Sequence, residues 1–486
     1  MPGPAESPLV NLQRLFDPDS IAVVGASTDE HKIGYEAMAN AVRFGGEAYP
    51  VNPSSEGEVL GEPFVASVTD IDATVDLALL CVPGPVVPEV LTECGEAGVG
   101  AAVIYAGGFA EAGERGEDLQ RATIEAAREG DVALLGPNTS GFVVPADDLL
   151  CSFAGGIEGI RPGNVAVVAQ SGGVAHDVSF RSIAEDRGLS AMVGLGNRAN
   201  VGFEEVIEFF DGDERTDAIV LHVEGTDDAR GLLETCRAAD TPVVAYKVGK
   251  ADVGEFAQSH TGALTGDHEL YEAGFSQYGV PTVESTEELL DAGVALADSP
   301  VPDGPNVGVV TAQAGPGIII SDTLQQLGAD LPTLSESTQE TVGEILPGIT
   351  YADNPVDTGR PMPEFGEVVR AVAGDDAVDL VVVYELFEEA LGFPVEAVRD
   401  LASEVDKPVL FATQGPPDAM ADQLAAMREA DVPVFSSPER VARAAGALIG
   451  YADRRTGSGV AVTDGRADGD DGGTDGVDDG GVSADV

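Results

Sequence analysis

The sequence predicts an α/β protein with three units built on parallel sheets, followed by an acidic C-terminal tail. Strand-like apolar runs alternate with helical patterns, several of these runs end in Gly-rich turns, and the second half of the chain contains an internal repeat. Continuous β-branched runs separated by helices are typical of parallel sheets that are covered on both faces. Such sheets bind ligands at the carboxyl ends of their strands. We therefore look for function first at the Gly-rich turns.

The strand-like runs leave room for a helix between most neighbours, as parallel connections require. In order, they are IAVVGAS (21–27), VDLALLCVP (75–83), GAAVIYAGGF (100–109), NVAVVAQSGG (164–173), TDAIVLHVEG (216–225), TPVVAYKVG (241–249), NVGVVTAQAG (306–315), VDLVVVYEL (378–386) and KPVLFATQG (407–415).

Four segments of the second half recur in the same order, which indicates a duplicated α/β unit. The matching pairs are 164–173 with 306–315, 216–225 with 378–387, 240–249 with 406–415, and 279–298 with 431–450. We expect a first domain over residues 8–144, a second over 145–298, and its duplicate over 305–453. From about Thr456 the sequence is rich in Gly and Asp with little to bury, so residues 456–486 are expected to form a disordered acidic tail.

The charge balance excludes several classes of partner. The formal net charge is −60, from 85 acidic against 25 basic residues, so nucleic acid and anionic membranes would be repelled. We expect a folded protein with an acidic surface, as in proteins adapted to high intracellular salt. No apolar run is long enough to span a bilayer, and the N-terminus lacks a signal pattern, so we expect a cytoplasmic protein. The four cysteines lack CxxC spacing, and no metal site is expected.

The first unit begins with a turn typical of nucleotide sites. Gly25, Ala26 and Ser27 follow the first strand, where Gly lets the backbone approach a phosphate and the next helix offers free N–H groups. The spacing departs from G-x-G-x-x-G, and Asn52 replaces the acidic residue that usually closes the second strand of an NAD site. The pattern leaves the ligand open, and a Gly required only by a tight turn is the alternative. Further turns at 81–85, 105–109 and 136–138 could line the same crevice.

The second unit contains a loop that its duplicate lacks. About fifteen residues separate the strand ending at Gly415 from the next strand, whereas the segment after Gly249 is longer and contains Ser-His-Thr-Gly-Ala-Leu at 259–264. A neutral imidazole can accept and release a phosphoryl group near pH 7, which makes His260 a candidate nucleophile. A structural role is the alternative for a single histidine.

Two further groups would support a phosphorylated histidine. Such a histidine needs an acceptor for its other N–H, and Glu224 stands at a strand end of the same unit. The phosphate needs donors, and the turn Ser171, Gly172 and Gly173 opens a helix whose N-terminal amides could supply them. The alternatives are an ordinary strand-end carboxylate for Glu224 and a helix cap for Ser171.

The order of the motifs GAS, VPGP, YAGGF, GPN, QSGG, VEG, SHTGAL and GVPTV resembles the α subunit of succinyl-CoA synthetase. It resembles more closely the α part of ADP-forming acetyl-CoA synthetases, which also have a third α/β unit. The likeness covers nearly all of residues 8–455, and S-H-T-G-A-L combined with an upstream Q-S-G-G is specific. It implies a Rossmann-like CoA-binding domain followed by two flavodoxin-like CoA-ligase domains.

The resemblance also implies roles for residues that match the family motifs. The phosphorylated histidine would be His260, the glutamate that stabilises it Glu224, and the phosphate-binding turn Ser171, Gly172 and Gly173. The residues implied to contact CoA are Gly25, Ala26, Ser27, Lys32, Val51, Asn52, Val82, Pro83, Ala106, Gly107, Gly108 and Asn138.

The activity implied is that of an ADP-forming acyl-CoA synthetase. Acyl-CoA, ADP and phosphate would be interconverted with the carboxylic acid, CoA and ATP through acyl phosphate and a phosphohistidine. The family's ATP-grasp half is missing, so we expect a separate β subunit that carries ADP or ATP with Mg²⁺, in an α2β2 assembly. A CoA-binding regulatory or scaffold protein and an NAD-dependent oxidoreductase are the alternatives.

Two positions depart from the succinyl-CoA synthetase pattern. A lysine shortly after Asn-Pro is replaced by Ser54 and Ser55, which removes one expected contact to CoA phosphate. A tyrosine shortly after the SG turn is replaced by His176, which implies a different acyl pocket.

Overall fold

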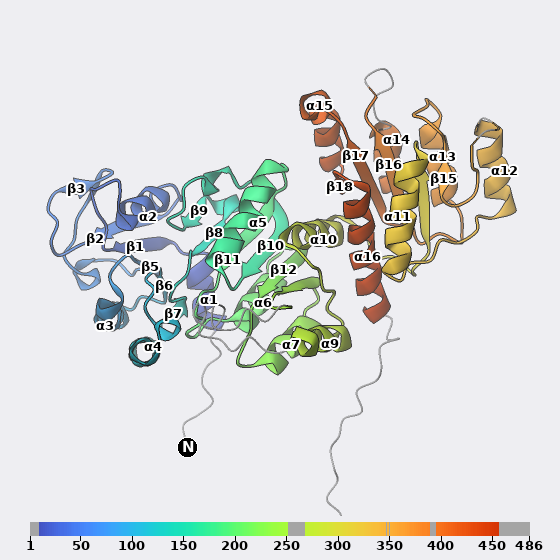
Figure 1. Cartoon of the computed structure of the whole chain (residues 1–486). Helices are drawn as coiled ribbons and strands as arrows, with labels where there is room; N and C mark the ends of the chain where they lie inside the picture. The colour runs from blue at the N-terminus through green and yellow to red at the C-terminus, as the bar shows by residue number, and fades with distance from the viewer. Residues whose placement is uncertain (1–8, 251–267, 347, 349, 389–394, 456–486) are drawn as a thin grey trace, which may run out of the picture.

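The computed structural model describes residues 9–250, 268–346, 348, 350–388 and 395–455. Three sheets lie side by side in chain order, each between layers of helices (Figure 1). The predicted fold class is confirmed, and each of the predicted strand-like runs contains a strand. His260 and the 456–486 tail lie outside the described residues. Within the described ranges, every helix is too short or too polar to cross a membrane.

The first sheet has five parallel strands in the order β2-β1-β5-β6-β7. Apart from the edge strand β2, its strands are buried, because helices cover both faces and β-branched and aliphatic side chains fill the space between the layers. The strands are β1 (Ser20–Val24), β2 (Glu47–Val51), β5 (Leu77–Leu80), β6 (Ala101–Ile104) and β7 (Ala133–Leu135); the helices are α1 (Leu9–Phe16), α2 (Ile33–Ala41), α3 (Val87–Ala97) and α4 (Glu114–Gly130); β3 (Glu58–Val59) and β4 (Glu62–Pro63) form a small antiparallel pair.

The second sheet has the order β13-β12-β10-β11-β8-β9. Four strands are parallel, but β8 and β9 form an antiparallel hairpin on the edge of β11, which the sequence did not predict. The strands are β8 (Phe142–Val144), β9 (Leu149–Cys151), β10 (Pro162–Ala169), β11 (Leu189–Gly194), β12 (Ala218–Val223) and β13 (Val243–Lys247); the helices are α5 (Gly172–Ala184), α6 (Phe203–Asp211), α7 (Ala229–Ala238), α9 (His268–Tyr278) and α10 (Thr286–Asp298).

The third sheet has five parallel strands in the order β15-β14-β16-β17-β18. This order repeats β11-β10-β12-β13 of the second sheet, where Thr282 adds a bridge beside β13. The strands are β14 (Val307–Thr311), β15 (Val356–Asp357), β16 (Leu380–Leu386), β17 (Val409–Gln414) and β18 (Val434–Phe435); the helices are α11 (Ala314–Gln326), α12 (Glu336–Ile345), α13 (Phe365–Ala373), α14 (Val395–Glu404), α15 (Pro417–Arg428) and α16 (Pro438–Arg455).

The first and second units share an apolar core. Phe16 of α1 packs against Phe142 of β8 and Phe210 of α6, with ring centres 5.1 and 5.2 Å apart. All three rings are buried, and apolar burial of this kind is the main stabilising contribution to a fold. The packing holds the carboxyl ends of the first and second sheets in a fixed relation.

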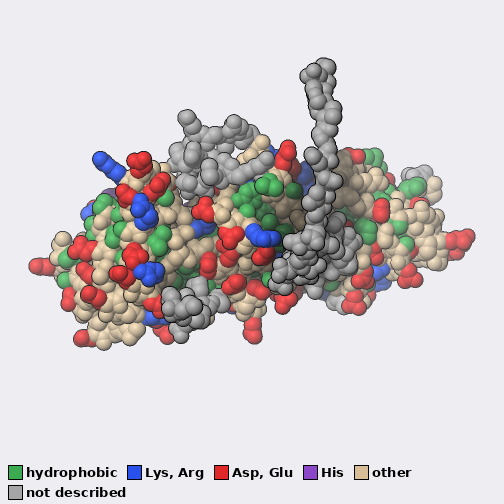
Figure 2. All heavy atoms as spheres, turned by 90° about the horizontal axis from the view of Figure 1, so that it is seen from below, with side chains coloured by type: hydrophobic (Ala, Val, Ile, Leu, Met, Phe, Trp, Pro, Cys, Tyr) green, Lys and Arg blue, Asp and Glu red, His purple; other side chains and the backbone are tan. Residues whose placement is uncertain are grey.

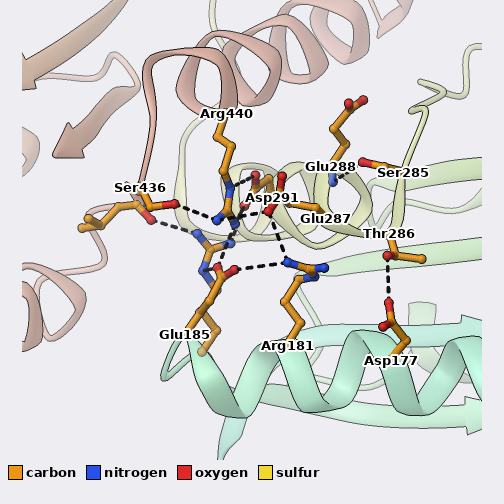
Figure 3. Close-up of polar contacts among 12 residues, drawn as sticks. Asp177, Arg181, Glu185, Ser285, Thr286, Glu287, Glu288, Asp291, Ser436 and Arg440 are labelled. Carbon is orange, nitrogen blue, oxygen red and sulfur yellow. Dashed lines mark hydrogen bonds and ion pairs between the residues drawn. The ribbon is translucent and has the colours of Figure 1, made fainter. Parts of the chain in front are cut away.

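The second and third units meet through α10 and α16, which occupy equivalent places in the repeat. The buried carboxylate of Asp291 accepts hydrogen bonds from Arg187 at 2.8 Å and from Arg440 at 2.6 and 2.7 Å. Arg440 also pairs with Glu185 at the end of α5, so three helices converge on one cluster of charges (Figure 3).

The two copies of the repeat carry opposite charges at equivalent positions of this junction. The match of 279–298 with 431–450 places Glu288 opposite Arg440 in the alignment, and Asp291 opposite Arg443. In the structure, Arg440 pairs with Asp291 and Arg443 pairs with Glu288 at 3.3 Å. In two identical copies, these contacts would bring side chains of the same charge together. The difference in sequence between the two copies makes each contact a pair of opposite charges.

One face of the molecule shows the acidic surface that the composition predicts (Figure 2). Asp and Glu side chains spread over the face shown in Figure 2, with few Lys and Arg side chains between them. The basic residues that the junction uses are thus drawn from a small total of 25.

Candidate functional site

Gln170 joins two of the predicted site segments at the carboxyl edge of the second sheet. Its buried side chain accepts hydrogen bonds from the backbone N–H groups of Glu224 at 2.9 Å and Gly225 at 3.1 Å. Gln170 precedes Ser171, so this contact brings the end of β12 next to the first turn of α5. The structure therefore places Glu224 and the Ser171–Gly173 turn together.

The first turn of α5 is open toward this edge. Ser171 is the N-cap residue, but its hydroxyl makes no capping hydrogen bond, which argues against the alternative that Ser171 serves only as a cap. The first backbone N–H groups of a helix have no acceptor within the helix and attract anions. Gly172 packs closely on the first unit, because a Cβ at this position would lie 2.8 Å from the hydroxyl of Ser140. A larger residue would push the helix away from Ser140.

Charged groups surround the end of β12. Lys247, at the end of β13, is almost fully buried, and its ammonium group lies 4.9 Å from the centre of the Tyr271 ring. Burial lowers the pKa of Lys247, while the negative charges of Glu224 and Glu272 act in the opposite direction. Tyr271 accepts a hydrogen bond from the backbone N–H of Thr226 at 2.9 Å, which fixes α9 beside this edge.

The second predicted catalytic residue, His260, belongs to the segment 251–267 between β13 and α9. Both ends of that segment are described. Lys247 pairs in register with Val223, the residue before Glu224, and α9 begins at His268 and contacts Thr226 through Tyr271. The described elements on both sides of this segment, β13 and α9, therefore lie beside the strand end that carries Glu224.

The turns predicted to bind CoA gather at the carboxyl edge of the first sheet. The N–H of Gly25 donates to the carbonyl of Val51 at 2.8 Å, and Asn52 donates from its side chain to the carbonyl of Ala26 at 2.8 Å. Gly25 has φ +90°, and a Cβ there would overlap the carbonyl oxygen of Cys81. A Cβ at Gly34 would overlap the carbonyl oxygen of Gly25, so α2 can approach this turn only with Gly at position 34.

The remaining predicted CoA residues follow at the neighbouring strand ends. Asn138 donates its backbone N–H to the carbonyl of Ala106 at 2.9 Å, which joins the turns after β6 and β7. Gly107 and Gly108 are exposed, and Glu111 accepts from the N–H of Gly108 at 2.5 Å, so this amide already has an acceptor. The other predicted residues are also at strand ends or turns: Ser27 accepts from the Asp29 N–H at 3.0 Å, Lys32 is exposed at the start of α2, Val82 is half-buried and Pro83 is exposed.

Comparison with known proteins assigns both edges to domain families. Residues 19–145 match the CoA binding domain family, and residues 162–296 match the succinyl-CoA ligase like flavodoxin domain family. The α subunit of acetate–CoA ligase (ADP-forming) II of Pyrococcus furiosus is 34% identical over 462 residues, which cover 92% of this chain and 99% of that protein. The chain belongs to this family of ligase α subunits.

Other relatives agree with this identification. The α subunit of acetate–CoA ligase (ADP-forming) I of Pyrococcus furiosus is also 34% identical, over 90% of this chain and 97% of that protein. Among solved structures, the dinucleotide-forming acetyl-coenzyme A synthetase 1 of Ca. Korarchaeum cryptofilum, in complex with phosphate and ADP, matches with a TM-score of 0.83 at 30% identity, over 92% of this chain and 97% of that one. The chain is thus an acid–thiol ligase subunit, and the oxidoreductase alternative is wrong.

The loop after β11 connects the two edges of the ligase subunit. The backbone N–H groups of Asn197 and Ala199 donate to the carbonyls of Pro137 and Gly136, both at 2.9 Å. The side chain of Asn197 donates to Glu111 at 2.6 Å. The turn that carries Asn138 therefore lies between the predicted CoA edge and the predicted phosphate edge.

His176, the position that departs from the succinyl-CoA synthetase pattern, lies in the first turns of α5. Its ring centre is 6.1 Å from that of Phe180, and its Nε2 atom is buried without a hydrogen-bond partner in the described structure. Burial lowers the pKa of His176, so the ring is neutral near pH 7. A neutral imidazole beside a phenyl ring suits an uncharged pocket wall.

Several residues of this edge were not singled out from the sequence. Gln170 belongs to the quoted QSGG motif, but only its hydrogen bonds reveal that it joins two strand ends. Arg198, Lys247 and Ser140 carry no motif of their own and are brought to the edge by the fold. Within the described residues, no group of His, Cys, Asp and Glu side chains is arranged to hold a metal ion.

Proposed function

We propose that this α subunit exchanges the CoA of an acyl-CoA for phosphate and passes the phosphoryl group to a partner through His260. The observation that carries the proposal is the Gln170 side chain, which holds Glu224 beside the open first turn of α5. This arrangement offers an acceptor for an imidazole N–H and donors for a phosphate within one edge. The CoA-type turns lie at the neighbouring edge of the first sheet.

The chemistry can be written from the residues of the chain. In the energy-recovering direction, phosphate attacks the thioester carbonyl, the C–S bond breaks, and acyl phosphate and CoA result. One imidazole nitrogen of His260 then attacks phosphorus, and the acyl carboxylate leaves. Glu224 accepts the hydrogen bond of the other imidazole nitrogen and stabilises the positive charge that develops on the ring. The amides of Gly172 and Gly173 stabilise the phosphoryl oxygens.

CoA would lie along the turns of the first sheet. The exposed backbone at Gly107 and Gly108 and the tight turn at Gly25, which has no side chain, leave room for a phosphate-bearing chain next to the backbone. The proposed contact residues are those given above for this edge, from Gly25 to Asn138. The acyl group would extend toward the start of α5, where the rings of His176 and Phe180 lie against each other.

Transfer to a nucleotide requires a second subunit. The relatives from Pyrococcus furiosus are named as α subunits, and the Korarchaeum relative was solved with phosphate and ADP. We propose that an ATP-grasp β subunit binds ADP and Mg²⁺, receives the phosphoryl group from His260, and joins this chain in an α2β2 assembly. Acetate is the acid suggested by the names of these relatives.

The test uses the purified α/β pair and radioactive phosphate. With acetyl-CoA and ³²P-phosphate, the α subunit should acquire a label that is stable to base and lost in acid, and His260→Ala should abolish it. His31→Ala is a matched control, because His31 is exposed on the first unit, and this variant should acquire the same label from acetyl-CoA and ³²P-phosphate as the wild type. Labelling of the His260→Ala chain would contradict the assignment. An unlabelled wild-type chain that still binds CoA would favour the regulatory alternative.

A further inference from the structure

Arg198 is held in a backbone conformation that residues with a side chain rarely adopt. Its φ is +56°, in the left-handed region. The residues on either side are fixed to the first unit, because Asn197 and Ala199 donate their N–H groups to the carbonyls of Pro137 and Gly136. A Gly or Asn would relieve this strain, so an Arg at this position needs a reason that lies in its side chain.

The side chain of Arg198 extends into the phosphate edge. Its guanidinium carbon lies 5.6 Å from the centre of the Phe203 ring, and its Nη1 atom is buried without a hydrogen-bond partner in the described structure. Glu224 and Asp227 are close enough to stabilise its positive charge. Arg remains protonated even when buried, so an unsatisfied Nη1 leaves a charged donor without an acceptor.

The buried arginines at the junction of the second and third units show the contrast. Arg187 and Arg440 are almost buried, whereas Arg198 is half-buried and only its Nη1 is fully enclosed, and both junction arginines donate directly to the carboxylate of Asp291. An unsatisfied buried donor destabilises a protein, and a charged donor does so more than a neutral one. Arg181 at the junction also has an unpaired nitrogen, its Nε, but its Nη1 donates to Glu287, whereas Arg198 has no ion pair among the described residues, which favours a donor kept for a ligand.

A second unsatisfied donor lies on the loop that follows β10, at the same edge of the sheet. The Nε2 of Gln170 is buried and without a partner in the described structure, while the Oε1 of the same side chain is fully used by Glu224 and Gly225. The loop of Arg198 is joined to Gln170, because Gly196 donates its N–H to the Gln170 carbonyl at 3.1 Å. Arg198, Gln170 and the first amides of α5 thus lie on neighbouring loops at the same edge of the second sheet.

We propose that Arg198 binds the phosphoryl oxygens of the reacting phosphate, with Gln170 as the neutral donor beside it. This proposal rests on the proposed function and assigns a charged contact that the predicted Ser171–Gly173 turn lacks. The guanidinium offers two N–H groups in one plane, which fits two oxygens of a phosphate. Its positive charge would also offset the repulsion between an incoming phosphate and the carboxylate of Glu224.

The decisive variant is Arg198→Gly in the complete α/β pair. Gly removes the guanidinium but adopts a positive φ without strain, so the loop should keep its shape. Asp148→Gly is the matched control, since Asp148 is an exposed residue with φ +49° in the turn between β8 and β9. Both variants should unfold at or above the wild-type urea midpoint.

The two chains should then differ in their use of phosphate. For Arg198→Gly, the KM for inorganic phosphate in the acetyl-CoA-consuming direction should rise about 10- to 100-fold, the range expected for losing a hydrogen bond from a charged group. The KM for acetyl-CoA should stay within about twofold, and Arg198→Lys should fall between wild type and Arg198→Gly. Asp148→Gly should match wild type in both constants.

Three results would overturn the proposal. A phosphate KM unchanged in Arg198→Gly would show that the guanidinium does not contact phosphate. A rise confined to the KM for acetate in the reverse direction would place Arg198 on the acyl carboxylate instead. A wild-type pair that turns over without requiring phosphate would refute the proposed function itself, and the inference about Arg198 with it.

Discussion

Asp291→Ala should uncouple the second and third units and destabilise both. Asp291 is 1% exposed and accepts three hydrogen bonds, one from Arg187 and two from Arg440. Its removal leaves two arginines in a buried position without this acceptor. Glu185, which pairs with both arginines, would remain as a partial substitute at 2.8 and 3.3 Å.

The size of the effect follows from the burial of the pair. Removing one partner of a buried ion pair costs about 3–5 kcal/mol, because the remaining charge stays desolvated. The repeat supplies a control of the same chemistry in a different environment. Arg443 pairs with Glu288 at 3.3 Å, but its side chain is 42% exposed, so Arg443→Gln should cost less than about 1 kcal/mol.

The measurement is urea unfolding of the full-length chain at constant salt, followed by circular dichroism. The decrease in the free energy of unfolding should be several-fold larger for Asp291→Ala than for Arg443→Gln. If the junction couples the second and third units, Asp291→Ala should also split the single unfolding transition into two. Equal and small effects of the two substitutions would refute the claim that the buried cluster holds the units together.

Three further predictions concern titratable groups and salt. Burial and the charge of Lys247 lower the pKa of His222 to about 4. As the pH falls, this histidine is therefore protonated first in the unfolded chain, and the free energy of unfolding should decrease by about 2 kcal/mol between pH 7 and pH 5. In urea titrations at both pH values, His222→Tyr, which introduces the residue that the repeat has at Tyr384, should lose most of this pH-dependent decrease. Burial raises the pKa of Glu185, but the hydrogen bond from Arg440 and the nearby arginine charges outweigh burial and lower the pKa. The stabilising contribution of Glu185 should therefore be present above about pH 4.5 and be lost as the pH falls through the lowered pKa. Glu185→Gln should reduce the acid-side pH dependence of the free energy of unfolding, and an unchanged dependence would contradict this. The net charge of −60 should make the thermal midpoint rise between 0.1 and 2 M KCl, and a midpoint that falls would argue against an acidic surface adapted to salt.

Much of the architecture could be predicted because the strands are buried on both faces. Runs such as those at 164–169 and 306–311 are apolar without alternation, which distinguishes parallel strands from exposed antiparallel ones. The hairpin β8–β9 was missed because its strands have only three residues each, although the turn residues Pro-Ala-Asp-Asp at 145–148 stand between them. Short strands depend on the sheet edge that they join, and the sequence does not display that edge.

The candidate site was predictable only where a residue belongs to a motif. Glu224 and the Ser171–Gly173 turn were found through VEG and QSGG, and Gln170 brings them together. Arg198 was missed because its significance depends on a positive φ and an unpaired Nη1, which are properties of the folded chain. The domain limits remain predictions. The role of His260 also remains a prediction, because His260 lies outside the described residues.

The most direct test of the account is the site of phosphorylation in the working enzyme. The α/β pair would be mixed with acetyl-CoA and phosphate, quenched in base, digested, and the peptides of the α subunit analysed by mass spectrometry. We predict one phosphate on the peptide that spans residues 251–267, attached to His260 and lost when ADP is added. A phosphate on any other residue, or turnover with no phosphorylated peptide at all, would contradict the central claim.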